Sequence, residues 1–202
     1  MSEFRIFIGS SSESRHVVSK VLQIISEIPP IEELTVVARP WYANDVFTLG
    51  DVAIESVERE AESTDLAIFI FGDGDELTFR HSKYMCPRDN VVFEAGLFMG
   101  KLGRKKVFLL TPIKEAVVNG LPFKSVSDLN GLTVVYCDTR DLPGGFSREV
   151  VLKIKEAIIN MMKKDLRTDV AAPNTKIKEP LESSPIKDYS RIIPNSIFGG
   201  AQ

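Results

Sequence analysis

The sequence contains few of the side chains that form disulfides or hold metal ions. Its 202 residues include two cysteines, Cys86 and Cys137, and two histidines, His16 and His81. Two cysteines so far apart do not make the dense framework of a small secreted domain. Neither histidine has a cysteine or a second histidine at metal-ligand spacing. We therefore expect two reduced thiols and no metal site.

The chain also has little net charge and no long apolar run. Its formal net charge of −3 at pH 7 indicates no basic surface for nucleic acid or for an anionic membrane. No apolar run approaches the roughly 20 residues that span a bilayer. The first residues lack the pattern of a secretory signal peptide. The expectation is a cytoplasmic protein that contacts neither a membrane nor nucleic acid directly.

What the sequence does contain is an alternation of short apolar runs with longer stretches of helical period. Hydrophobic residues make up 44% of the chain, enough to fill a core. The runs predict strands at residues 4–9, 34–40, 66–72, 106–111 and 132–138. The periodic stretches predict helices at residues 12–28, 48–62, 89–102 and 147–164. This alternation predicts an α/β fold, a flavodoxin-like three-layer αβα sandwich with a five-stranded parallel sheet in the order 2-1-3-4-5.

Helix-end signals support two of these helices. Thr48 and Asp51 have the spacing of a capping box at the start of the second helix, with Asp in place of the usual Glu. Asp89 is the expected N-cap of the third helix, and Gly103 is its expected stop.

The remaining segments carry weaker patterns. Residues 72–88 are expected to form a long loop, and residues 112–130 a connection with one short helix. After Asp169, four prolines interrupt a polar, charged stretch. We therefore expect a folded domain at residues 1–168 and a linker or tail at residues 169–202.

One carboxylate stands out in the stretch PRDNVVFEAGLFMG, residues 87–100. Glu94 lies in a run that is otherwise apolar or glycine, and burying an unpaired carboxylate is costly. It has two interpretations: a buried ion pair with Arg5 or Arg88, or a functional group. Ligands of open α/β sheets bind beyond the carboxyl ends of the strands, where the strand order reverses. Glu94 is expected roughly 7–8 Å from the start of its helix, close enough to line that crevice.

Two loops are expected at the same crevice. The loop GSSSES, with Gly9, Ser10 and Ser11, has backbone N–H groups and hydroxyls suited to phosphate, although a serine-rich turn is also ordinary helix-capping chemistry. The loop WYANDVF offers Trp41 and Phe47, which either stack on a planar ring or hold their own loop in place.

Helical spacing places the carboxamide of Asn90 one turn before the Glu94 carboxylate. A carboxamide above a carboxylate in an apolar wall is a reasonable sugar-binding pair.

Four stretches resemble one known family: FIGSSSE, Trp41 with Phe47, DLAIFIFGDGDE and, above all, PRDNVVFEAGLFMGKLGR. Over about residues 4–165 the sequence is similar to the bacterial TIR-like nucleotide-binding family. This is the effector domain of cyclic-nucleotide-triggered phage-defence proteins, including bacterial STING fusions. The resemblance implies a TIR fold and the cleavage of NAD+ to nicotinamide and an ADP-ribose product.

The same resemblance implies roles for particular residues. The catalytic glutamate of the FE-x-G motif corresponds to Glu94. The residues expected to bind the nucleotide are Gly9, Ser10, Ser11, Trp41, Phe47, Arg88, Asp89 and Asn90. NAD+ is then a substrate, and no cofactor is expected. Such domains tend to be active only when assembled side by side, and they usually carry a cyclic-nucleotide sensor domain or take their signal from a partner.

A single carboxylate fits this chemistry, because nicotinamide is cationic in NAD+ and leaves as a neutral molecule without a general acid. Two alternatives stay open. Nucleoside deoxyribosyltransferases resemble this architecture, place a nucleophilic glutamate in a similar helix and also break an N-glycosidic bond. A non-catalytic module that binds a nucleotide or another TIR domain would instead use Glu94 as a core ion-pair residue.

Overall fold

The computed structural model describes residues 2–43, 46, 53–72, 74–113, 115–127, 129, 131–137 and 146–171, with no side-chain description for residues 53 and 167–171. Phe47 and the pair Thr48 and Asp51 lie outside the described residues. The same holds for residues 172–202, so the expected domain boundary at residue 168 stays a prediction.

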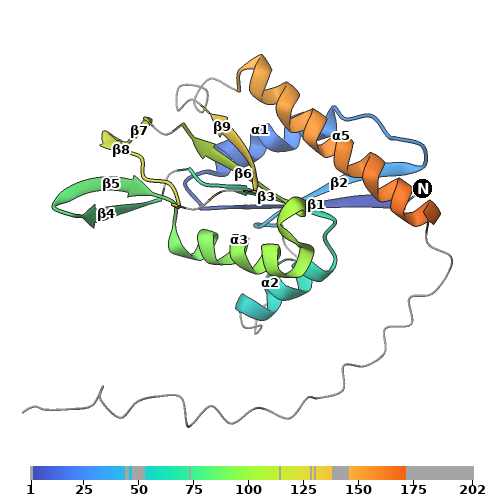
Figure 1. Cartoon of the computed structure of the whole chain (residues 1–202), viewed down its shortest axis with the longest axis horizontal. Helices are drawn as coiled ribbons and strands as arrows, with labels where there is room; N and C mark the ends of the chain where they lie inside the picture. Colours follow the sequence, from blue (N-terminus) through green and yellow to red (C-terminus); the bar gives the residue numbers. More distant parts are fainter. Residues whose placement is uncertain are drawn as a thin grey trace, which may run out of the picture.

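Five parallel strands form the central sheet (Figure 1). Their bounds are β1 (Ser2–Ser10), β2 (Leu34–Pro40), β3 (Leu66–Ile70), β6 (Val107–Pro112) and β9 (Thr133–Cys137). The spatial order is β2-β1-β3-β6-β9. Because β6 and β9 are the fourth and fifth strands of the sequence prediction, the predicted order 2-1-3-4-5 is confirmed. Every residue of β3 is buried, since this apolar strand is covered on both faces.

Helices cover both faces of the sheet and complete the three layers. The helices are α1 (Arg15–Ser26), α2 (Ala53–Glu62), α3 (Asp89–Leu102) and α5 (Arg148–Ala171), with a short 3-10 helix η1 (Arg104–Lys106). Figure 1 shows α1 and α5 on one face and α2 with α3 on the other. Among the described residues, no helix has the length and apolar character to cross a bilayer.

An aromatic cluster fixes α3 on the sheet. The ring of Phe98 is fully buried and stacks on Phe7 of β1, with ring centroids 4.7 Å apart. It also meets Phe69 of β3 edge-on, with centroids 5.3 Å apart. Aromatic rings in such pairs attract each other beyond the gain from burying their surface. The cluster therefore holds α3 firmly against the two central strands.

The long loop expected at residues 72–88 is wrong for most of its length. Strands β4 (Asp75–Phe79) and β5 (Ser82–Cys86) form an antiparallel hairpin there. Its two-residue turn is Arg80-His81, with φ of 49° and 64°, the left-handed conformation of a tight hairpin turn. Asn-Gly and Asp-Gly are the usual signals for such a turn. Arg-His is not one of them, so this hairpin has no strong local signal in the sequence.

The short helix expected within residues 112–130 is also wrong. In the described part of that segment, β7 (Val117–Val118) and β8 (Leu121–Pro122) pair as a second hairpin. Its turn is Asn119-Gly120, with φ of 50° and 79°. Here the signal was present, because Asn-Gly between apolar residues is typical of a tight hairpin turn.

The ends of α3 agree with the sequence in part. Gly103 terminates the helix with φ of 85°, as expected, and its N–H donates to the Met99 carbonyl at 3.0 Å. The N-cap is Arg88 rather than Asp89, which is the first helical residue. The side chain of Asp89 accepts a hydrogen bond from the Asn90 N–H at 2.7 Å, which occupies one of the unpaired donors of the first turn.

Candidate functional site

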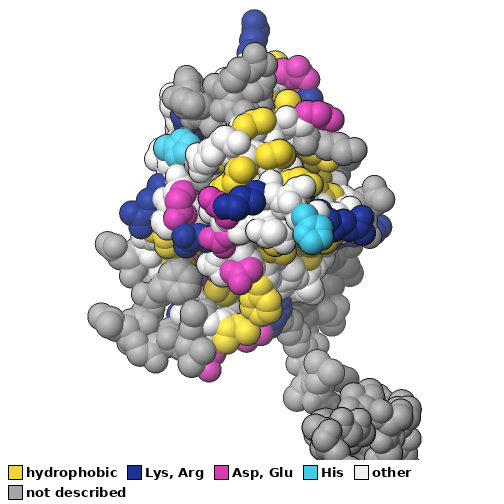
Figure 2. All heavy atoms as spheres, turned by 90° about the vertical axis from the view of Figure 1, so that its left-hand side faces the viewer, with side chains coloured by type: hydrophobic (Ala, Val, Ile, Leu, Met, Phe, Trp, Pro, Cys, Tyr) yellow, Lys and Arg dark blue, Asp and Glu magenta, His cyan; other side chains and the backbone are white. Residues whose placement is uncertain are grey.

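The candidate site lies at the carboxyl edge of the sheet, where β1 and β3 end side by side. Ser10, the last residue of β1, is in register with Ile70, the last of β3. The chain leaves these strands toward opposite faces, into α1 after β1 and toward α3 after β3. This is the topological switch point at which open α/β sheets bind ligands. Figure 2 looks onto this end of the molecule, where acidic and basic side chains lie interspersed between hydrophobic ones.

Gly9 allows close packing of β1 against the ring of Phe69 on β3 at this edge. A Cβ atom at this position would overlap the ring of Phe69 on the neighbouring strand. Any side chain here would therefore displace the aromatic cluster beneath α3. The structure thus gives the Gly9 position a structural reason, independent of any contact with a ligand.

The serine side chains are buried and hydrogen-bonded within the protein. The Ser10 hydroxyl donates to the Ser11 carbonyl at 2.9 Å and accepts from the Trp41 indole N–H at 2.9 Å. The Ser11 hydroxyl donates to the Ser14 hydroxyl at 3.3 Å. These bonds build the turn into α1, which favours the capping interpretation for the hydroxyls. A phosphate at this loop would be held mainly by backbone N–H groups.

The aromatic loop packs onto the serine loop. Besides its bond to Ser10, Trp41 meets Tyr42 edge-on, with ring centroids 5.5 Å apart. The guanidinium of Arg15, in the first turn of α1, lies 5.1 Å from the Trp41 ring centroid and 4.8 Å from that of Tyr42. Cation–π contacts of this kind tie the two loops together. The structure therefore joins Trp41 to Gly9, Ser10 and Ser11.

Arg88 connects three parts of the site. Its Nη2 donates to a carboxylate oxygen of Glu13 in the serine loop at 2.8 Å. Its Nε lies 3.6 Å from Oδ1 of Asp75 in the β4–β5 hairpin. The pKa of Glu13 is lowered, first by a hydrogen bond with its own backbone and further by the positive charge of Arg88. The guanidinium thus links the serine loop, the hairpin and the start of α3.

Glu94 is half-buried on α3. Its burial alone raises the pKa of the carboxyl group to about 7. Among the described residues, no hydrogen bond or ion pair reaches this carboxylate. The ion-pair interpretation is therefore wrong: Arg5 pairs with Glu3, with Nε and Oε2 3.2 Å apart, and Arg88 pairs with Glu13 and Asp75.

The first two residues of α3 are more accessible than Glu94. Asp89 and Asn90 are both exposed, and Asn90 lies one helical turn before Glu94 on the same side of the helix. One turn after Glu94 comes the buried Phe98. The carboxylate therefore sits between an exposed carboxamide and the aromatic core, which explains its desolvation.

Two residues of this site were missed from the sequence: Glu13 and Arg15. Glu13 and Arg15 belong to the stretch GSSSESR, where two opposite charges beside a predicted helix start were visible but had no assigned partner. Asp75 joins them because the β4–β5 hairpin brings it to Arg88. In chemical terms the site combines one carboxylate of raised pKa, an arginine, and aromatic rings beside a helix N-terminus.

Comparison with known proteins gives a consistent relationship. A family model described as "CAP12/Pycsar effector protein, TIR domain" matches residues 5–139. The sequence is 38% identical over 133 residues to Pycsar effector protein BcPycTIR of Burkholderia cepacia, covering 66% of this chain and 40% of that protein. It is 33% identical over 130 residues to CD-NTase-associated protein 12 of Sphingobacterium faecium, covering 64% of this chain and 35% of that protein.

These relatives are longer than the part that matches. The chain spans 40% of BcPycTIR and 29% of Pycsar effector protein PaPycTIR of Pseudomonas aeruginosa, to which it is 43% identical over 94 residues, 46% of this chain. Among solved structures, the flavoenzyme FerB of Paracoccus denitrificans aligns over 81% of this chain and 98% of that chain. Its TM-score of 0.35 and identity of 12% are too low to bear on the fold or the function.

Proposed function

Because the chain belongs to the CAP12/Pycsar effector TIR-domain family, we propose that it cleaves NAD+ to nicotinamide and an ADP-ribose product. We further propose that it acts in the cytoplasm as the effector of an anti-phage defence system. The observation that carries the enzymatic part is Glu94, a half-buried carboxylate on the first half of α3 whose pKa is raised to about 7. Groups with strongly perturbed pKa values at a switch-point crevice are typical of catalytic sites.

The proposed reaction needs one carboxylate and no general acid. The bond between the ribose C1′ and the nicotinamide nitrogen breaks with its electron pair leaving on nitrogen, so the cationic ring departs neutral. Positive charge then develops on the ribose, and an ionised Glu94 stabilises it or attacks C1′ transiently. Water completes the hydrolysis and releases the ADP-ribose product.

Desolvation makes Glu94 effective in this role. A carboxylate with few hydrogen-bond partners interacts more strongly with a developing cation than a fully hydrated one. With a pKa raised to about 7, part of the free molecules carries a protonated Glu94 at neutral pH. A cationic substrate selects the ionised form. We therefore expect kcat/KM to fall about tenfold per pH unit below pH 7 and to level off above it.

The neighbouring residues suit the rest of the substrate. Backbone N–H groups of the serine loop and the Arg88 guanidinium are chemically matched to the pyrophosphate. The Trp41 ring can stack on a planar base. The Asn90 carboxamide can form a hydrogen bond with a ribose hydroxyl. Arg88 would exchange its contact with Glu13 for one with phosphate.

The decisive experiment measures nicotinamide release from NAD+ by the wild type and by Glu94→Gln. The assay is run over a range of protein concentrations, because we propose that self-association, set by a sensor domain or partner, activates the domain. Glu94→Gln is expected to lose about 10²–10³-fold in rate, the effect of removing one preorganised charge-stabilising group. The control is Glu156→Gln, an exposed carboxylate on α5, which should keep full activity.

Two outcomes would favour the alternatives. Transfer of deoxyribose between nucleobases, with no nicotinamide release, would indicate a deoxyribosyltransferase-like enzyme. Equal activity of Glu94→Gln and wild type in assembled samples would exclude Glu94 as the catalytic group. The non-catalytic module required a core ion pair at Glu94, and its described surroundings contain none.

A further inference from the structure

A cavity of about 720 Å³ lies beside the two hairpins, at the carboxyl ends of β6 and β9. It is lined by residues of β4 and β5, by the end of β6, by residues 123–127 and 129, and by Tyr136 of β9. The segment that follows β8 joins β5 here, since the Lys124 N–H donates to the Met85 carbonyl at 2.7 Å. Figure 1 shows both hairpins beyond the carboxyl edge of the sheet. Cavities of this volume are in the range of small-molecule sites.

The cavity leaves one face of the edge strand β9 uncovered. Val134 and Tyr136 point to the same face of the sheet, because side chains alternate along a strand. Val134 packs against the core beneath α2 and α3, whereas Tyr136 is 52% exposed. In the described part of residues 113–131, the connection between β6 and β9 forms a hairpin and no helix. A large aromatic side chain of the central sheet therefore stays accessible.

Accessible apolar side chains line the rest of the cavity. Phe79 of β4 is 42% exposed, and Ile113 and Val126 are 37% and 36% exposed. With Tyr136, these are four of the eight large hydrophobic side chains that are exposed among the described residues. Exposed apolar side chains scattered singly are ordinary, but their gathering around one cavity marks a binding site. A ligand that enters the cavity removes this apolar surface from water.

Four aromatic rings surround the cavity and do not pair with one another. They come from four separate segments and are Phe79, Tyr84, Phe123 and Tyr136. The ring pairs formed by the described residues lie elsewhere, in the cluster beneath α3 and in the aromatic loop. Phe123 is buried and supports the wall, so the accessible ring surface belongs to the other three. An aromatic ligand would supply the ring partner that these side chains do not find in one another.

The polar side chains that line the cavity can all donate hydrogen bonds. Nζ of Lys124 lies 4.9 Å from the Phe79 ring centroid, a cation–π contact that holds the ammonium group in the wall. The other polar groups are the hydroxyls of two tyrosines and two serines, and the described lining includes no carboxylate or carboxamide. An ammonium group only donates, and a hydroxyl donates where an acceptor is offered. A ring with acceptor atoms in its plane, such as a nitrogen heterocycle, suits both the rings and the donors.

We propose that this cavity binds a planar nitrogen heterocycle, of the class of purine bases and nucleosides. The heterocycle stacks on Tyr136 and covers Ile113 and Val126, and its ring nitrogens accept hydrogen bonds from Lys124 and from a hydroxyl of the wall. The cavity shares no lining residue with the site around Glu94. The proposal therefore does not depend on the proposed NAD+ chemistry.

The test uses the fluorescent nucleoside ethenoadenosine as the probe, with binding measured by fluorescence titration of the whole chain. The wild type is expected to bind one equivalent, which adenosine displaces and ribose does not. Tyr136→Ala is expected to lose at least about tenfold in affinity, because the stacking contact is lost. Tyr136→Phe keeps the ring and should stay within about threefold of the wild type. Lys124→Met should lose at least about fivefold, since one charged donor is removed.

The matched control is Leu152→Ala, which removes an apolar side chain of α5 that is 48% exposed and does not line the cavity. This control should bind the probe like the wild type, and circular dichroism checks that each variant is folded. Unchanged binding in Tyr136→Ala, or an equal loss in Leu152→Ala, would overturn the proposal. So would binding that is lost in Trp41→Ala and kept in Tyr136→Ala, because the probe would then lie in the candidate active site. A wild-type dimer that Tyr136→Ala dissociates and that binds no probe would show that a second copy covers this face, and would also overturn the proposal.

Discussion

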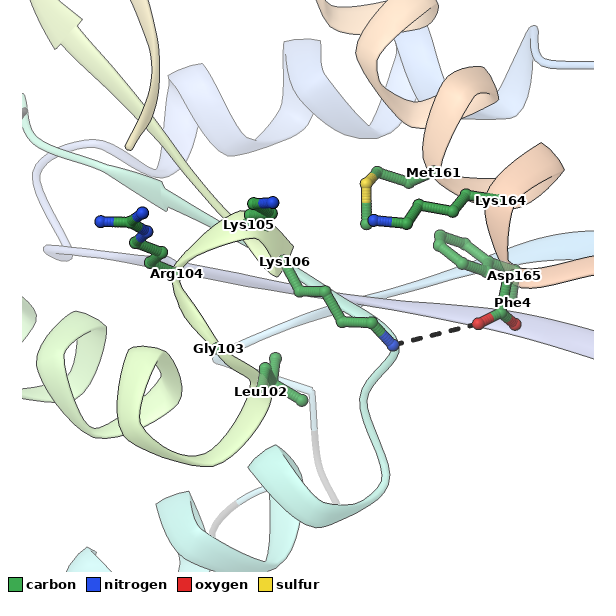
Figure 3. Close-up of a pocket in the computed structure, with 9 residues that line it drawn as sticks. All are labelled: Phe4, Leu102, Gly103, Arg104, Lys105, Lys106, Met161, Lys164 and Asp165. Atoms are coloured by element: carbon green, nitrogen blue, oxygen red, sulfur yellow. Dashed lines mark ion pairs between the residues drawn. The ribbon is translucent and has the colours of Figure 1, made fainter. Parts of the chain in front are cut away.

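The two ends of α3 differ in whether their charged groups have partners. Toward the carboxyl edge of the sheet, Glu94 is a single carboxylate that burial has brought to a pKa of about 7, while nearby charges are paired with one another. At the amino edge, Lys106 of η1 pairs with Asp165 of α5, with Nζ and Oδ1 3.9 Å apart (Figure 3). Desolvation makes the first end suited to stabilising a transient cation. At the second end, the ion pair connects η1 with α5.

Both ends belong to one helix, α3, so the largest effect should come from weakening the packing of that helix on the sheet. Phe98→Ala removes a fully buried ring from the cluster with Phe7 and Phe69. We expect the free energy of unfolding to fall by about 3–5 kcal/mol, measured by urea denaturation. Phe93→Ala, on the same helix but 59% exposed, is the control and should cost far less. Similar losses for both would mean that the cluster does not fix α3.

A second prediction concerns the decrease in the free energy of unfolding when Glu94 is ionised. The folded-state pKa lies above the ordinary 4.5, so the folded state binds more protons between these values and stability falls as pH rises from about 4.5 to 7. Glu94→Gln abolishes this loss. We expect the variant to be more stable than the wild type at pH 8 by about 1–2 kcal/mol, allowing for partial exposure.

Denaturation curves at pH 4 and pH 8 test this sign, with Glu156→Gln as the control of unchanged pH dependence. A destabilised Glu94→Gln at pH 8 would indicate a favourable partner for the carboxylate and would contradict the contrast between the two ends. Gain of stability together with loss of activity would be the signature of a site kept at the expense of the fold.

A third prediction tests whether Arg88 binds the substrate or instead holds the serine loop and the β4–β5 hairpin together. Arg88→Met should raise the KM for NAD+ about tenfold, since a charge-assisted phosphate contact is lost. Glu13→Gln should leave KM unchanged or lower it, because it releases the guanidinium. If both variants raise KM alike, Arg88 acts by joining the serine loop to the hairpin. Steady-state kinetics on both variants decide between these readings.

The smallest effect is expected at the amino edge. The pair of Lys106 and Asp165 is 3.9 Å long and both side chains are about one-third exposed. Lys106→Gln should therefore change the free energy of unfolding by less than about 0.5 kcal/mol. A larger loss, measured by urea denaturation, would mean that this ion pair contributes substantially to the stability of the fold.

Much of the fold followed from local patterns in the sequence. The alternation of apolar runs and periodic stretches predicted five parallel strands in the order observed, because buried parallel strands and amphipathic crossover helices each have a distinct period. Gly103 marked the end of α3 for a similar local reason, a backbone conformation that favours glycine. The two hairpins were missed, one with an unusual Arg-His turn and one despite an Asn-Gly turn.

By itself, the sequence determined the class of fold, the family to which the chain belongs and the unusual position of Glu94 in an apolar helix. Only the tertiary structure decided which partners the charged groups take. Arg88 meets Glu13 across 75 residues of sequence, Trp41 meets Ser10 across 31, and Lys106 of η1 meets Asp165 of α5. Local periodicity specifies which face of a helix or strand is buried. Local periodicity carries no information about contacts between distant segments. Such contacts determine the desolvation of Glu94 and the surroundings of both ends of α3.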